Sequence, residues 1–134
     1  MLTVFLFLPV YLISQEPVKE ETSALRQVKK VLYGLASYYA DKFQGRQTAT
    51  GDIFSQGKIT AACNVLPLGT WIRVTNLKNG KSLRVKTNDR LHPKTRRIID
   101  LSHEAARQLD YLKQGLTRVK IEVLSNNIAS LDKQ

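Results

Sequence analysis

Asp89 is the one acidic residue between positions 73 and 97, a stretch of 25 residues that also holds nine lysines and arginines. A carboxyl is a candidate for general acid–base catalysis, because it can give a proton to a reacting atom and take one back. To donate near neutral pH it needs burial or a nearby carboxylate, either of which favours the protonated form. Asp52 is a second candidate. The alternative is that Asp89 is a turn residue after Asn88 and that Asp52 lies in an exposed Gly-Asp turn.

Cys63 is the only cysteine, so the chain cannot form an intramolecular disulfide or a multi-cysteine metal cluster. The two histidines, His92 and His103, are not spaced as a pair of metal ligands, and no glycine-rich loop is present to cradle a phosphate. The sequence therefore predicts no metal site and no cofactor. An exposed loop position is favoured for His92, and a structural or solvent-facing position at the start of a helix for His103.

The chain is strongly basic, with 21 Lys and Arg against 11 Asp and Glu and a formal net charge of +10. Such a surplus is typical of proteins that work beside polyanions, such as nucleic acid, anionic lipid or an anionic wall polymer. The excess is concentrated in residues 73–97, where nine basic residues less one acid give +8. This stretch is either the solvated outer face of a hairpin or a surface that faces a polyanion.

Alternation of polar and apolar residues predicts two half-buried antiparallel strands, at residues 70–75 and 82–87. Between them, Asn79-Gly80 supplies the positive φ that a tight hairpin needs. We also expect strands at residues 31–39, 97–100 and 117–124.

A short helix is expected after Ser102, which is a good N-cap, and Glu104 in its first turn suits the positive end of the helix dipole. Gly115 lies in the turn that follows. Short strands, many turns and one or two small helices predict a mainly β fold, a compact β-barrel. A chain of 134 residues is long enough for one such domain.

The ends of the chain differ from this body. Residues 1–13 form an uncharged apolar run, too short to span a bilayer as a helix but typical of the core of a signal peptide. We expect residues 1–15 to direct export, with a buried N-terminal strand as the alternative, and no stable membrane span. Residues 16–31 are interpreted as a linker or short helix, and residues 125–134 as a polar tail. The domain then spans residues 32–124.

A series of short motifs in the body closely resembles, in order and spacing, the rare lipoprotein A (RlpA) family of septal-ring lytic transglycosylases. The resemblance covers about 90 of the 134 residues. The motifs are Gly34-Leu-Ala-Ser-Tyr-Tyr39, Phe43-Gln-Gly-Arg46, Thr48-Ala-Thr-Gly-Asp-Ile-Phe54, Thr60-Ala-Ala-Cys-Asn-Val-Leu-Pro-Leu-Gly-Thr70, Val74-Thr-Asn-Leu77, Asn79-Gly80, Asn88-Asp-Arg90, Arg97-Ile-Ile-Asp-Leu-Ser102 and Ala105-Ala106.

The resemblance implies a six-stranded double-psi β-barrel with one or two short helices, preceded by the apolar or helical N-terminal segment. It implies a periplasmic or cell-envelope enzyme that cleaves the MurNAc–GlcNAc β-1,4 bond of peptidoglycan glycan strands, often strands stripped of stem peptides. The C6 hydroxyl of the sugar attacks C1 and closes a 1,6-anhydro ring, so no water is used. Many family members add a C-terminal SPOR domain for septal targeting. No such domain follows the barrel in this sequence, and division or envelope partners are left open.

By the same resemblance, Asp89 matches the catalytic aspartate of the family. Because the substrate supplies its own nucleophile, one carboxyl suffices as acid and then base, whereas ordinary glycosidases need two. Asp52 stands where family members commonly carry glutamate. It is expected either to help keep Asp89 protonated or to position a sugar hydroxyl.

Two departures from the family pattern bear on catalysis. Cys63 stands where the family places an active-site histidine, and a thiol cannot carry a positive charge or relay hydrogen bonds through two nitrogens. Catalysis then depends on Asp89 and Asp52, is reduced, or is lost, and a buried small apolar role is favoured for Cys63 itself. His92 follows Leu91 where the family often has Gly-Pro-Phe, and it is a candidate to replace the missing imidazole.

Substrate binding is assigned to aromatic and basic residues near the matched motifs. Aromatic rings can pack against the C–H faces of sugars, although such rings are also common in cores. Arginines can bind the lactyl carboxylates or the hydroxyls of a glycan strand. The candidates are Tyr38, Tyr39, Phe43, Arg46, Phe54, Arg90 and His92.

Two functions from different classes follow. The first is an enzyme, a peptidoglycan lytic transglycosylase in which Asp89 is the acid and base. The second is a non-catalytic glycan-binding or wall-loosening module that has lost turnover with Cys63. A basic nucleic-acid binder is disfavoured, so no nucleic-acid partner is expected.

Overall fold

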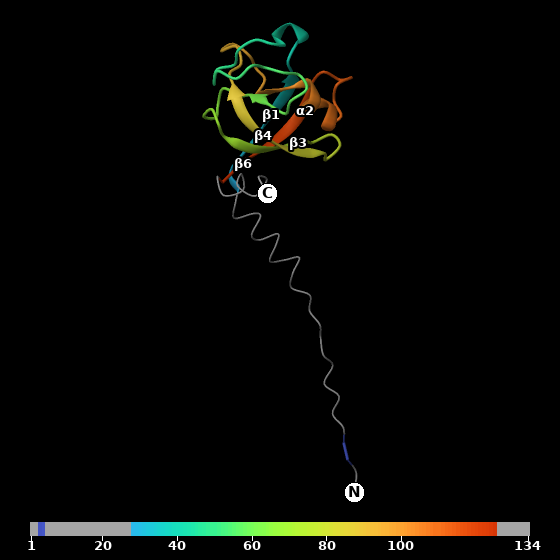
Figure 1. Ribbon diagram of the computed structural model, residues 1–134. Coiled ribbons are helices and arrows are strands. Elements are labelled where there is room, and N and C mark those ends of the chain that lie inside the picture. Colours follow the sequence, from blue (N-terminus) through green and yellow to red (C-terminus); the bar gives the residue numbers. More distant parts are fainter. Residues whose placement is uncertain (1–2, 5–27, 126–134) are drawn as a thin grey trace.

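Six strands close into a barrel, which confirms the predicted fold class (Figure 1). The computed structural model describes residues 3–4 and 28–125. Around the barrel the strands follow the order β1-β5-β2-β4-β3-β6. The elements are β1 (Val28–Tyr38), the 3-10 helix η1 (Asp41–Phe43), β2 (Ala61–Ala62), β3 (Trp71–Asn76), β4 (Ser82–Asp89), β5 (Ile99–Leu101), α2 (His103–Gln108) and β6 (Thr117–Leu124).

The β3–β4 hairpin forms where the alternating pattern predicts it, with β3 one residue later than expected and β4 two residues longer at its end. Ile72 and Val74 point into the barrel, while Arg73 pairs with Arg84 of β4 on the outer face. Gly80 has a φ of 76°, in the left-handed region that the hairpin turn requires.

The boundaries of the other strands correct several expectations. β1 begins at Val28, so residues 28–31, which we assigned to the linker, form its first part. They pair with the end of β6, which lies at residues 117–124 as predicted. β5 is Ile99–Leu101, two residues later at its start than expected. β2, the pair Ala61–Ala62, is too short to be recognised as a strand from its own sequence.

Two pairs of neighbouring strands in the barrel are parallel. β1 pairs in parallel with β5, and β2 pairs in parallel with β4, while all other neighbouring strands are antiparallel. β2 therefore lies between β4 and β5. This arrangement brings together the ends of strands that are far apart in the sequence.

Helix α2 begins where Ser102 was expected to cap it. The Ser102 hydroxyl accepts a hydrogen bond from the backbone N–H of Ala105, and Ala105 and Ala106 are buried against the barrel. On the exposed side, the Arg107 guanidinium bonds Glu104 and lowers the pKa of that carboxyl to about 2.

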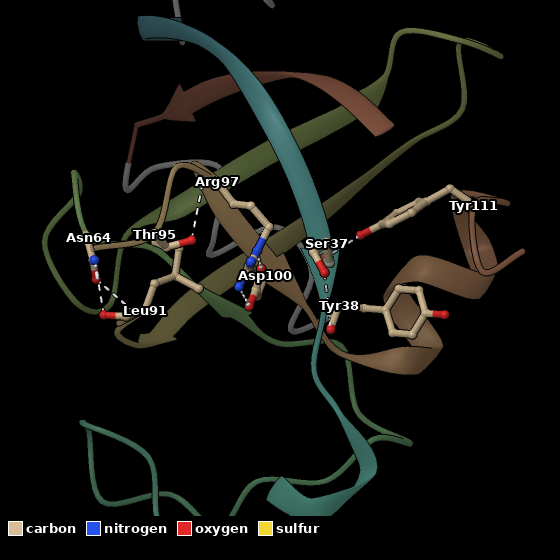
Figure 2. A network of polar contacts seen from close by, with 8 residues as sticks. All are labelled: Ser37, Tyr38, Asn64, Leu91, Thr95, Arg97, Asp100 and Tyr111. Atoms are coloured by element: carbon tan, nitrogen blue, oxygen red, sulfur yellow. Dashed lines mark hydrogen bonds and ion pairs between the residues drawn. The ribbon is translucent and has the colours of Figure 1, made fainter. Parts of the chain in front are cut away.

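Two tyrosines tie β1 to the segment after α2. The Tyr111 hydroxyl donates to the carbonyl of Ser37 over 2.8 Å (Figure 2). The Tyr38 hydroxyl donates to the carbonyl of Leu112 over 2.8 Å. Burial, followed by the charge of Asp100, raises the pKa of Tyr111, so the buried hydroxyl stays protonated and donates. These reciprocal bonds fix the end of β1 from which the cavity described below is built.

The interior of the barrel is apolar and closely packed. Cys63, fully buried, belongs to this core. The buried strand residues of the core are Ala36, Ala61, Ile72, Val74, Val85, Ile99, Leu101, Val119 and Ile121. A second, smaller cluster of Tyr39, Phe54, Ala62 and Leu91 lies beneath the cavity.

No helix within residues 3–4 and 28–125 is long and apolar enough to cross a membrane. The predicted signal segment, except for residues 3–4, and most of the predicted linker and tail lie outside the described residues.

Candidate active site

A cavity of about 580 Å³ opens at the ends of β1, β2, β4 and β5. The segment after β1, including η1, forms one wall, and the segment after β4 forms another. The polar and aromatic residues that line it are Ser37, Tyr38, Tyr39, Lys42, Phe43, Asp89, Arg90, His92, Arg97 and Asp100, with Ala62 between them.

Asp89, the last residue of β4, lies in this cavity as the sequence analysis required. Its Oδ2 accepts a 2.6 Å hydrogen bond from the Tyr39 hydroxyl. Its Oδ1 accepts hydrogen bonds from the backbone N–H groups of Ala49, over 3.0 Å, and Arg90, over 2.8 Å. Three neutral donors therefore fix the orientation of the carboxylate, which excludes the simple turn role for Asp89.

Tyr39 holds Asp89 from the end of β1. Burial and, next, the hydrogen bond to Asp89 raise the pKa of Tyr39, so its hydroxyl remains a donor. Its ring stacks on Phe54, with centroids 4.1 Å apart and planes inclined by 14°, and meets Phe43 edge to face. Tyr39 is 8% exposed. The side chain therefore acts as a rigid support for Asp89, with little surface free to receive a sugar ring.

Asp100, on β5, is a second carboxylate in the cavity and was missed in the sequence analysis. Arg97 binds it through two hydrogen bonds, Nε to Oδ1 over 2.8 Å and Nη2 to Oδ2 over 3.0 Å (Figure 2). This bidentate contact raises the pKa of Arg97 and places a full positive charge against the carboxylate. The available signal was the Arg97-Ile-Ile-Asp100 motif itself, which we used as a strand and as part of the family resemblance without giving Asp100 a role.

Ala62 separates the two carboxylates. Its register partners are Asp89 on the β4 side and Asp100 on the β5 side. Because neighbouring strands are about 4.8 Å apart, the two aspartate Cα atoms are about 10 Å apart across β2. All three residues line the cavity.

Cys63, predicted at a catalytic position, lies in the core. It is fully buried among apolar residues that include Leu66, and it is not among the residues that line the cavity. Its backbone N–H donates to the carbonyl of Asp89 over 3.0 Å. The position therefore corrects the catalytic assignment and agrees with the alternative of a small buried residue, because the described contact with the cavity is through the backbone.

Asp52 is exposed and is not among the cavity-lining residues. Its carboxylate accepts a 2.9 Å hydrogen bond from the Thr50 hydroxyl, and its carbonyl accepts one from the N–H of Thr48. These bonds shape the loop whose Ala49 N–H reaches Asp89. Asp52 thus supports the loop from an exposed position, which agrees with the alternative of an exposed turn.

Arg90 and His92 both line the cavity, but Arg90 has a structural role there. Its Nη1 donates to the carbonyls of Cys63 and Leu66, each over 2.5 Å, so the guanidinium braces the segment after β2. His92 is exposed, and its Nδ1 accepts a hydrogen bond from the N–H of Lys94. The exposed loop position favoured for His92 is confirmed.

The other predicted substrate-binding residues differ in how far they are exposed to the cavity. Phe54 is 2% exposed and lies beneath Tyr39, so the predicted role as a sugar platform is wrong for this ring. Tyr38 lines the cavity but packs edge to face on His103. Phe43 is partly exposed and lines the cavity, whereas Arg46 is exposed with its guanidinium 5.4 Å from the centroid of the Phe43 ring.

Within the described part of the chain, no three His, Cys, Asp or Glu side chains are grouped so as to hold a metal ion.

A family model described as "Lytic transglycolase" matches residues 32–121, which include every cavity residue named above. The chain belongs to this lytic transglycolase family.

Curated relatives of this chain are named endolytic peptidoglycan transglycosylase RlpA. The chain is 45% identical over 91 residues to that of Haemophilus influenzae, covering 68% of this chain and 32% of the relative. It is 47% identical over 91 residues to that of Pseudomonas aeruginosa, covering 68% and 27%. It is 49% identical over 94 residues to that of Rickettsia bellii, covering 68% and 41%. The chain thus spans about a third of the length of these relatives.

Solved structures confirm that the lytic transglycolase domain is a double-psi β-barrel. A Streptomyces papain inhibitor has a TM-score of 0.59 at 22% identity, covering 72% of this chain and 96% of the inhibitor. An expansin from Clavibacter michiganensis has a TM-score of 0.58 at 23% identity, covering 72% and 52%. A mutant of that expansin, in complex with cellohexaose, has a TM-score of 0.56 at 20% identity, covering 72% and 52%. At these identities the likeness concerns the fold alone.

Proposed function

We propose that this protein is a peptidoglycan lytic transglycosylase, which cleaves the MurNAc–GlcNAc β-1,4 bond and leaves a 1,6-anhydro-MurNAc end. The observation that carries the proposal is the placement of Asp89 and Asp100 on either side of Ala62 in one open cavity. The names of the curated relatives supply the substrate and the reaction.

The reaction needs one proton given and one proton taken. A carboxylic acid protonates the oxygen that bridges the two sugars, and the bond from C1 to that oxygen breaks. The C6 hydroxyl oxygen of the MurNAc unit bonds to C1, and its proton passes to a carboxylate. The products are a free hydroxyl on GlcNAc and a 1,6-anhydro ring on MurNAc, so no water is consumed. Two carboxylates in one cavity can divide these two transfers.

The neighbours of each carboxylate assign the roles. Asp100 is paired through both of its oxygens with the guanidinium of Arg97. Asp89 is held by hydrogen bonds from neutral donors. We therefore assign Asp89 as the acid and Asp100 as the base. This extends the sequence hypothesis, in which Asp89 performed both steps.

The position of Cys63 bears on the non-catalytic alternative. That alternative depended on the loss of a histidine from the active-site group. Because the Cys63 side chain is buried in the core and both cavity carboxylates are present, cleavage is the function that the cavity favours.

Product analysis tests the proposal. Purified protein is incubated with glycan strands freed of stem peptides, and the products are examined by mass spectrometry, with Asp89→Asn as the control. We expect strands that end in 1,6-anhydro-MurNAc from the natural protein and at least about 100-fold less from the variant. Products heavier by one water would identify a hydrolase instead. Retained binding to the strands without any cleavage would favour the glycan-binding module.

We also propose that the protein acts in the periplasm or cell envelope, where its substrate lies. The support is the uncharged apolar run at residues 1–13, which is typical of a signal peptide. Residues 1–27 fused to a reporter enzyme that is active only after export should give activity. Loss of that activity is expected when two leucines of the run are replaced by lysine, and an inactive natural fusion would contradict the proposal.

A further inference from the structure

Two positive side chains lie against one aromatic ring at the mouth of the cavity. Lys42 Nζ is 5.3 Å, and Arg46 Cζ 5.4 Å, from the centroid of Phe43. All three residues lie in or just after η1, Lys42 and Arg46 are exposed, and Phe43 is partly exposed. Lys42 and Phe43 also line the cavity. We call Lys42, Phe43 and Arg46 the cationic rim.

The two arginines that line the cavity are already engaged. Arg90 donates to the carbonyls of Cys63 and Leu66, and Arg97 is paired with Asp100. Neither Lys42 nor Arg46 forms an ion pair with another described residue. The charges of the cationic rim are therefore available to a ligand, whereas those of Arg90 and Arg97 serve the protein itself.

The chemistry of the cationic rim indicates what it can bind. Lys42 and Arg46 can each give an anionic group of the substrate a charged hydrogen-bond partner, and a carboxylate is such a group. A neutral glycan would gain no comparable advantage from two cations. The partly exposed Phe43 ring adds an apolar surface against which a sugar ring can pack.

We propose that the cationic rim is a subsite that binds a carboxylate of the glycan substrate, with Phe43 against the adjoining sugar ring. The inference rests on the proposed function and specifies its substrate class, a glycan that carries carboxylates. Peptidoglycan offers two sources of this group: the lactyl carboxylate of a bare strand, and the carboxylates of a stem peptide.

Equilibrium binding to four defined tetrasaccharides tests the subsite. The ligands are bare MurNAc–GlcNAc with free lactyl carboxylates, the same sugar with those groups amidated, the peptide-bearing form, and neutral chitotetraose. Binding is measured on the full chain carrying Asp89→Asn, so that cleavage does not consume the ligand and the Arg97–Asp100 pair stays intact. The test variant adds Lys42→Gln and Arg46→Gln. The matched control adds Lys78→Gln, which removes one positive charge in the β3–β4 turn, at the far end of β4 from Asp89.

We expect the protein to bind a carboxylate-bearing tetrasaccharide about fivefold more tightly than the amidated one at low salt, with the preference weakening as salt is added. The rim variant should lose this preference and bind chitotetraose as before, while the Lys78→Gln control should keep it. Tighter binding of the bare strand assigns the lactyl carboxylate, and tighter binding of the peptide-bearing strand assigns the stem peptide.

Equal affinity for all four ligands, or equal loss of preference in the Lys78→Gln control, would overturn the subsite. The result is independent of the cleavage assay. If the natural protein yields no anhydro product but shows the carboxylate preference, the proposed function fails and the subsite stands. If the protein cleaves but the rim variant keeps its preference, the subsite fails and the proposed function stands.

Discussion

The Tyr39 hydroxyl donates a 2.6 Å hydrogen bond to Oδ2 of Asp89, joining the residue that follows β1 to the last residue of β4. The two residues are 50 positions apart in the sequence. Because Tyr39 is itself held by the Phe54 ring, the orientation of Asp89 depends on packing beneath the cavity. This relationship makes Tyr39 a positioning residue for the proposed acid.

Replacing Tyr39 by Phe should lower kcat by about tenfold, because the hydrogen bond that orients the Asp89 carboxyl is lost while the ring and its packing remain. KM should change by less than about twofold, since the hydroxyl points to Asp89 and not to the substrate. Steady-state kinetics on bare glycan strands measure both constants. Tyr33→Phe, at a position that is 63% exposed, is the matched control and should leave both unchanged. An equal change in KM would show that Tyr39 contacts the substrate.

The two buried tyrosines should make the protein less stable at alkaline pH. Burial is the main cause that raises the pKa of Tyr39 and of Tyr111 above the ordinary value of 10.0. Above pH 10 the unfolded chain therefore releases these protons while the folded chain keeps them. The free energy of unfolding then falls with rising pH, by about 1.4 kcal/mol per pH unit for each tyrosine. Below pH 10 this contribution is fully present.

Urea unfolding between pH 8 and pH 11 measures that slope. Tyr111→Phe should remove one tyrosine's share of it above pH 10, and Tyr39→Phe should remove the other. Lysines also titrate in this pH range, but they are the same in the natural protein and in both variants. Their contribution to the slope therefore cancels in the comparison. A slope that is unchanged in both variants would show that neither buried hydroxyl is responsible.

Local patterns were enough to predict the elements that form from neighbouring residues. The β3–β4 hairpin follows from alternation and from Asn79-Gly80, and β6 and the Ser102 cap were located correctly. β2 was missed because two residues, Ala61 and Ala62, are too few to show a period.

The site was only partly predictable because its geometry depends on β2. Asp89 and Asp100 meet across Ala62, through one parallel and one antiparallel pairing that no local pattern records. Side-chain direction was also beyond a reading of the sequence. Arg90 turns to two backbone carbonyls, and Cys63 turns into the core, although the motif places both beside the site.

The assigned roles of the two carboxylates can be separated by the leaving group. Asp89→Asn and Asp100→Asn should each lower cleavage of natural glycan by about 100-fold or more. A MurNAc glycoside with a 4-nitrophenyl leaving group needs no proton from an acid, so on it Asp89→Asn should recover most of its activity. Asp100→Asn should stay inactive, because the C6 hydroxyl still needs a base. Recovery in Asp100→Asn alone would exchange the two roles.

Gly34 is needed for the close approach of β1 to the segment before β5. A Cβ at this position would lie 2.7 Å from Cγ2 and 2.8 Å from Cβ of Ile98. Gly34→Ala should therefore destabilise the protein by about 1–3 kcal/mol in urea unfolding. Gly57→Ala is the matched control, because its nearest neighbour would be Ser55 Oγ at 3.8 Å, an ordinary contact.

A second substitution tests whether the clash with Ile98 causes the loss of stability in Gly34→Ala. Ile98→Ala removes the nearer of the two clashing atoms, so in the Gly34→Ala background it should be less destabilising than in the natural protein, and a double-mutant cycle measures the difference. Strictly additive effects would place the strain elsewhere.

Substitutions at Cys63 can distinguish a buried structural residue from a catalytic one. Cys63→Ala removes a sulfur that packs with Leu66 and Ile99 in the core, and it should cost about 1–2 kcal/mol of stability. Activity should remain within about threefold of the natural protein, since the described bond from this residue to Asp89 is made by the backbone N–H.

Cys63→His should be the more damaging change, because a larger polar ring must be buried among apolar side chains. We expect a lower melting temperature and no gain of activity. A loss of about 100-fold in folded Cys63→Ala protein would return the thiol to the catalytic group. A gain of activity in Cys63→His would instead show that the imidazole reaches the cavity and that its absence limits turnover.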